Sequence, residues 1–119
     1  MRNILAILTV LVFFLVSTTA FAAEGPMKLP SGAKPEAVKH NKEGIASWNK
    51  KDYKGALKHF SAASKIDGAS GEVHFNEAIC YDKIGQHGGA TKHFGVALKQ
   101  AGGNTKLLNS PILKGHLGM

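Results

Sequence analysis

Residues 55–68 read GALKHFSAASKIDG, and residues 89–102 read GATKHFGVALKQAG. When Gly55 is aligned with Gly89, eight positions carry the same residue in register. A fixed period of about 34 residues is typical of repeat proteins, in which each unit buries its apolar face against the next unit. The repetition therefore predicts two copies of one structural unit.

The pattern on either side of the repeated stretch is helical from Pro35 onward. Four helices are predicted, over residues 37–50, 53–66, 71–84 and 87–100, with Asp52 and Ser70 as N-caps of the second and third. The second and fourth helices each carry one stripe of small and aromatic residues: Ala56, Phe60 and Ala63, then Ala90, Phe94 and Ala97. The alanines allow two helices to approach closely while the phenylalanine fills the space between layers. The sequence thus predicts an all-α protein.

The C-terminal residues 105–119 begin like another unit and then depart from it. Ser110 followed by Pro111 is typical of a helix start, so we expect two short helices or one kinked helix here. This segment is predicted to cap the last unit. Two units and a cap are fewer than the usual minimum of about three repeats. A small monomer and self-association through an exposed helix face both remain open.

These units resemble tetratricopeptide repeats, which are helix-turn-helix units of about 34 residues. The small residue early in the first helix of that family matches Gly44 and Ala78, and the later alanine and aromatic positions match the two stripes. The turn glycine is Gly85 in the second unit and Lys51 in the first. The resemblance covers about residues 37–104 and implies a short right-handed solenoid, with repeat 1 at 37–70, repeat 2 at 71–104 and the cap at 105–119.

The resemblance also implies a binding groove, because in this family the inner surface is lined by the first helix of each unit. Apolar area, amide hydrogen bonding and positive charge together suit a protein or peptide ligand. Trp48 fits a groove position and a packing position equally well. The groove residues carried over from the family are Asn41, Lys42, Ile45, Trp48, Glu72, Phe75, Asn76, Ile79, Lys83 and Lys106.

The N-terminus has the three parts of a secretory signal peptide: a basic start, an apolar run over residues 4–16, and Ala20-Phe21-Ala22 as a cleavage site. We expect residues 1–22 to be removed after Ala22 and the rest to be exported, to the periplasm or beyond in a bacterium. An uncleaved anchor over residues 4–23 is the alternative, since that length just spans a bilayer. Residues 23–35, rich in proline and glycine, are predicted to form an extended linker before a repeat domain at 36–119.

The charge is carried almost entirely by lysine. The chain has a net charge of +7 and a single arginine, Arg2. Arginine is the usual residue for bidentate phosphate and base contacts, so nucleic acid is not an expected partner. The positive charge instead predicts a partner with an acidic surface.

Catalytic and metal chemistry receive little support from the sequence. There is no nucleophile–base pair, no paired carboxylates at a cleft and no phosphate-binding glycine loop. The six histidines include two pairs at equivalent repeat positions, His40 with His74 and His59 with His93. Equivalent positions on stacked helices are expected to lie about 8–10 Å apart, too far for shared ligation. We therefore expect no metal and no cofactor, and a buried, inert thiol at Cys80, the only cysteine.

The function expected from the sequence is that of an exported adaptor that binds a protein or peptide in the groove without catalysis. The alternative is a structural or accessory subunit of a larger envelope complex, or a homo-oligomer formed by stacking of repeats.

Overall fold

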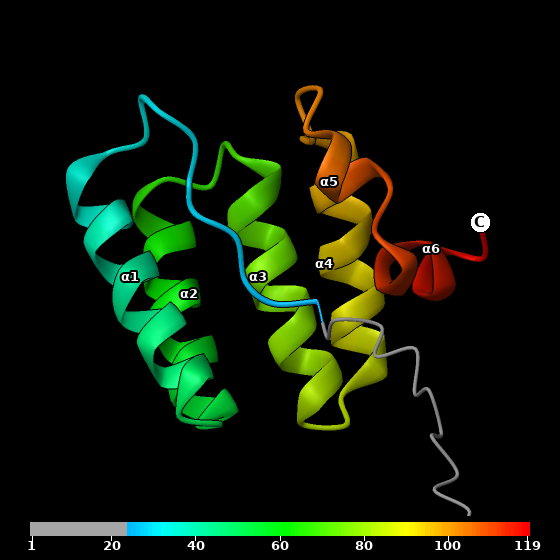
Figure 1. The fold of residues 1–119 in the computed structure, drawn as a ribbon, viewed down its shortest axis with the longest axis horizontal. Coiled ribbons are helices and arrows are strands. Elements are labelled where there is room, and N and C mark those ends of the chain that lie inside the picture. Colours follow the sequence, from blue (N-terminus) through cyan, green and yellow to red (C-terminus); the bar gives the residue numbers. More distant parts are fainter. Residues whose placement is uncertain (1–23) are drawn as a thin grey trace, which may run out of the picture.

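The computed structural model describes residues 24–119, and the predicted signal peptide lies outside them. The described chain is all-helical and contains no strand. Its six helices are α1 (Pro35–Asn49), α2 (Tyr53–Ile66), α3 (Gly71–Lys83), α4 (His87–Lys99), α5 (Thr105–Leu108) and α6 (Pro111–Leu117). Figure 1 shows α1 to α4 as neighbouring rods in chain order, with α5 and α6 beside α4. α1 packs chiefly on α2, and α3 chiefly on α4, an arrangement consistent with a helical repeat.

Local signals explain where these helices begin. The Asp52 carboxylate accepts a hydrogen bond from the Gly55 amide at 2.9 Å, and Ser70 Oγ accepts one from the Val73 amide at 3.3 Å. Both side chains were predicted as N-caps, and both satisfy amides that have no partner within the helix. α1 begins two residues before its predicted start, because Pro35 occupies the first turn of the helix.

The predicted stripes form much of the core. Ala56, Phe60 and Ala63 of α2 are fully buried, as are the matching residues Ala90, Phe94 and Ala97 of α4. Close approach of α1 and α2 depends on Gly44, because a Cβ there would lie 2.5 Å from the Phe60 ring. Phe94 makes an edge-to-face contact with Phe75, with ring centroids 5.6 Å apart. The packing predicted from the repeated stretch is therefore confirmed within each helix pair.

The C-terminal residues form two short helices, one of the two arrangements expected from Ser110-Pro111. Asn104 and Ser110 act as N-caps of α5 and α6. Leu107 and Leu113 are fully buried in the cluster that also contains Phe94. α6 packs on α4, so one side of the last long helix is covered.

Candidate functional site

The N-terminal segment (residues 24–34) is not a free tether. It has no helix or strand, as its prolines predicted, but it crosses in front of α3 between α1 and the C-terminal helices (Figure 1). Met27 is 7% exposed and belongs to the same apolar cluster as Phe75 and Ile79. The segment therefore covers the face formed by α1 and α3, which we call the α1/α3 face, and is part of the folded unit.

Two asparagines hold the backbone of this segment. Asn76 accepts a hydrogen bond from the Met27 amide at 2.7 Å and donates one to the Met27 carbonyl at 2.8 Å. Asn41 donates to the same carbonyl at 3.0 Å, and its own side-chain oxygen accepts from Asn76 at 2.8 Å. Asn41 is 2% exposed and Asn76 is fully buried, so these bonds form in a site closed to water. The network holds one residue of an extended chain through both its backbone donor and its backbone acceptor.

Both ends of the segment are also fastened. The Glu24 carboxylate accepts a hydrogen bond from the Ile112 amide at 2.9 Å, in the first turn of α6. The Asp67 carboxylate, at the end of α2, accepts from the Lys34 amide at 3.0 Å and from the Ala69 amide at 3.3 Å. These two backbone hydrogen bonds hold the pKa of Asp67 below its usual value.

With the segment docked, several of the predicted groove residues are buried and others remain exposed. Phe75 and Ile79 are core residues, 0% and 1% exposed, and do not offer apolar area to a partner while Met27 is in place. Glu72 is also buried and accepts a hydrogen bond from the Asn104 side chain at 2.8 Å. The residues that remain partly or fully exposed are Lys42, Ile45, Trp48, Lys83 and Lys106.

The Trp48 side chain contributes to packing and is also partly exposed. It packs against apolar clusters of both repeats and makes an edge contact with Tyr53 at 4.8 Å between ring centroids. Lys83 Nζ lies 5.9 Å from the Trp48 ring and 5.6 Å from the Tyr53 ring, within cation–π range. Lys83, one of the predicted groove residues, is thus positioned by two aromatic rings.

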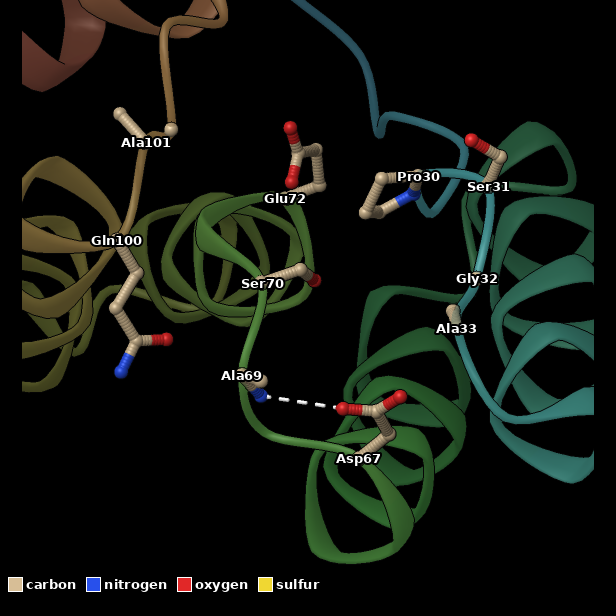
Figure 2. Close-up of a pocket in the computed structure, with 11 residues that line it drawn as sticks. Pro30, Ser31, Gly32, Ala33, Asp67, Ala69, Ser70, Glu72, Gln100 and Ala101 are labelled. Atoms are coloured by element: carbon tan, nitrogen blue, oxygen red, sulfur yellow. Dashed lines mark hydrogen bonds between the residues drawn. The ribbon is translucent and has the colours of Figure 1, made fainter.

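Two cavities remain beside the segment. One, of about 270 Å³, lies between the segment and α1 and is lined by Lys28, Leu29, Val38, Asn41, Lys42 and Ile45. The other, of about 330 Å³, lies at the turn over residues 30–33. Figure 2 shows this turn on one side of the second cavity and Gln100 with Ala101 on the other, with Glu72, Ser70 and Asp67 between them. The first cavity is apolar with lysines at its edge, whereas the second carries two carboxylates.

The histidines lie in three clusters that sequence reasoning missed. Within each repeat, a histidine and a glutamate of the first helix face a histidine of the second helix: His40, Glu43 and His59 in the first repeat, and His74, Glu77 and His93 in the second. A third cluster joins Asp82, His87 and His116. In each cluster the three ligand-type atoms lie within 4.8 Å of one another. From the sequence alone, shared ligation is considered only between equivalent histidines of successive repeats. The histidines that lie close together instead belong to the two helices of the same repeat.

Cys80 is fully buried against Phe60 and Ala56. Burial raises the pKa of its thiol to about 12, so the reactive thiolate is scarce at neutral pH. The predicted buried position of this cysteine is confirmed.

The fold and the site define an all-helical, repeat-like protein whose α1/α3 face holds an extended peptide segment. No protein-family model matches the chain, and no curated protein matches it. Among the helices that the structure describes, none is both long enough and apolar enough to cross a membrane.

Proposed function

We propose that this protein is an exported, non-catalytic adaptor of the tetratricopeptide-repeat type that binds a protein or peptide partner as an extended chain on the α1/α3 face. The repeat period and the pairing of α1 with α2 and of α3 with α4 support this family and a short right-handed solenoid. The packing of α6 on α4 supports a capping role for the C-terminal helices.

The observation that carries the proposal is the hold of Asn76 on both the amide and the carbonyl of Met27. Such a contact binds backbone atoms, which peptides of different sequence have in common. The neighbouring apolar cluster of Phe75 and Ile79 receives one side chain. The α1/α3 face therefore already binds an extended chain, and the present occupant is the protein's own N-terminal segment.

The expected partner follows from the contacts of this occupant. It has an apolar side chain at the place of Met27, where Phe75 and Ile79 form the receiving surface. It has acidic groups nearby, because Lys42, Lys83 and Lys106 are exposed. The partner displaces the segment, and its apparent affinity is reduced by the fraction of molecules in which the segment is docked.

The test separates the occupant from its site. In the mature chain, Met27→Asp places a charge in the apolar cluster and should release the segment without touching the asparagines. A fluorescent peptide with the sequence of residues 23–33 should then bind this variant, with a Kd of about 10 μM to 1 mM, corresponding to roughly 4–7 kcal/mol. Fluorescence anisotropy measures the binding.

Two controls make the result specific. The same peptide carrying aspartate in place of its methionine should bind at least about ten times more weakly, a difference of about 1.4 kcal/mol. The unaltered mature chain should bind the methionine peptide more weakly than Met27→Asp does, because its own segment competes. Equal binding of both peptides, or no binding to a folded Met27→Asp variant, contradicts the proposal. A peptide array read with the released variant would then define the partner sequence.

A further inference from the structure

We propose that His74, Glu77 and His93 form a binding site for a divalent transition-metal ion of the zinc class, ligated by Nδ1 of each histidine and by a carboxylate oxygen of Glu77. The site lies between the two helices of the second repeat, with His74 and Glu77 on α3 and His93 on α4. Two imidazole nitrogens and one carboxylate oxygen are a donor set that suits Zn²⁺.

The three ligand atoms converge. Glu77 Oε1 lies 3.3 Å from His74 Nδ1 and 3.9 Å from His93 Nδ1, and all three atoms lie within 4.8 Å of one another. The Glu77 side chain is only 6% exposed, and the histidine side chains are 13% and 20% exposed. These atoms therefore face one another across a space that is almost closed to water.

None of the three atoms has a hydrogen-bond partner within the described chain. His74 Nδ1, Glu77 Oε1 and His93 Nδ1 are all buried and make no hydrogen bond. A protonated His74 ring forms an ion pair with Glu77 at 3.3 Å, and this carboxylate raises the pKa of His74, but such a pair leaves His93 Nδ1 without a partner. Buried polar atoms are normally satisfied, and three unsatisfied atoms pointing at one place require an explanation. A cation satisfies all three at once, because it accepts electron pairs from both nitrogens and from the carboxylate.

The remaining contacts of these side chains favour ligation. His74 Nε2 lies 2.8 Å from the Gly68 carbonyl, an acceptor, so Nε2 carries the hydrogen and the neutral ring presents its lone pair at Nδ1. The second carboxylate oxygen of Glu77 accepts a hydrogen bond from Ser61 at 3.3 Å. Contacts of this kind fix the tautomer and orientation of metal ligands.

Ligation needs one movement. The His74 and His93 rings lie 6.0 Å apart between centroids and 20° from parallel, so one ring must turn to bring both lone pairs onto a single ion. His93 is the ring free to turn, since no hydrogen bond from residues 24–119 holds it and its other aromatic contact is a stack on Tyr81. Zn²⁺ tolerates the resulting geometry because it has no preference imposed by d electrons.

The other two clusters differ in ways that single out this one. The first repeat carries the same residue types at the equivalent positions, but the side chains of His40, Glu43 and His59 are 35–41% exposed and water competes for them. In the third cluster both nitrogens of His116 already have partners, Asp82 at 2.8 Å and Thr91 at 3.1 Å. In the first repeat only His40 Nδ1 is buried without a hydrogen bond, whereas in the second repeat all three ligand atoms are.

The experiment uses the mature chain, without a histidine tag and freed of metal, titrated with zinc chloride at pH 7.5 in a calorimeter. We expect one ion per chain at the tightest site.

His93→Asn and Glu77→Gln should each weaken that site by about 10–100-fold. The matched control His87→Ala, in the exposed part of the third cluster, should leave it unchanged. Free zinc at 100 times the Kd should raise the Tm of the unaltered chain by roughly 10 °C, and of His93→Asn far less.

A second measurement needs no variant. On zinc addition, the ¹⁵N resonances of Nδ1 in His74 and His93 should shift as metal-bound nitrogens do, while His74 Nε2 keeps its proton. Absence of zinc uptake below about 100 μM, or Nε2 ligation, overturns the proposal. Zinc uptake that survives both variants and is lost in His59→Ala also overturns it, because the ion then occupies the first repeat.

Discussion

At the scale of single residues, the two repeats differ at the turn between their helices. Lys51 adopts φ of 61°, and it is the only non-glycine residue with positive φ among those described. Gly85, its equivalent in the second repeat, has φ of 80° with open space where a Cβ would lie. A side chain in this left-handed conformation costs roughly 1–2 kcal/mol, whereas glycine adopts it freely.

Replacing Lys51 by glycine is therefore expected to stabilise the protein. The relief of strain is partly offset by the larger entropy that glycine gives the unfolded chain, so the free energy of unfolding should rise by about 0.5–1 kcal/mol. The reciprocal change, Gly85→Ala, should lower it by about 1 kcal/mol, because nothing but the backbone conformation opposes the methyl group. Urea denaturation followed by circular dichroism measures both. Two changes of the same sign would contradict this account.

The sequence identified the turn positions but not the role of Asn76. Lys51 and Gly85 could be located because a helix end leaves a local signal. The family resemblance assigns Asn76 to a groove, yet its ligand is the backbone of Met27, which is distant in the sequence. A backbone amide and carbonyl are the same in every residue. No side-chain pattern therefore indicates which backbone residue a distant asparagine will bind.

At the scale of elements, long helices were predictable and contacts between them were only partly so. The range of α2 matches its prediction, and α3 and α4 each end one residue early, because capping and periodicity are local properties. The histidine clusters depend instead on how the two helices of one repeat face each other. The spacing from His40 to His59, repeated from His74 to His93, is the signal that could have located them.

The junction between the N-terminal segment and α2 should depend on pH through Asp67. Hydrogen bonds from the Lys34 and Ala69 amides hold its pKa below the ordinary value of 3.8. A lowered pKa in the folded state means that the contribution of Asp67 to stability is complete above about pH 4 and is lost as the pH falls through the lowered value. Urea midpoints measured between about pH 5 and pH 2 should therefore fall less steeply in Asp67→Asn than in the unaltered chain.

Asp52→Asn is the control for this change. It also replaces an aspartate at a helix end, but Asp52 caps α2 through its Gly55 contact, and asparagine caps helices about as well. It should leave the free energy of unfolding at neutral pH nearly unchanged, and so controls for the replacement of an aspartate by asparagine at a helix end. An unchanged profile for Asp67→Asn would show that the segment junction does not depend on the ionised carboxylate.

At the scale of the whole molecule, the N-terminal segment joins parts that are far apart in the sequence. Glu24 bonds to α6, Met27 bonds to α1 and α3, and Lys34 bonds to the end of α2. A stack of only two repeats has few neighbouring units to share its core. The segment supplies additional buried contacts across both repeats, so release of the segment and loss of stability are linked.

Asn76→Ala tests this link, because it removes the central hold on the segment. The Met27 amide and the Asn41 oxygen lose their buried partner, so the free energy of unfolding should fall by about 2–4 kcal/mol. Hydrogen exchange should show the Met27 amide losing its protection while amides in the middle of α4 remain slow, since opening begins where contacts are lost. Asn49→Ala, at the exposed end of α1, should change neither quantity by more than about 0.5 kcal/mol. Fast exchange spread evenly over all helices of Asn76→Ala would mean that the segment and the repeats open as one unit, and a partner could then not displace the segment without unfolding the protein.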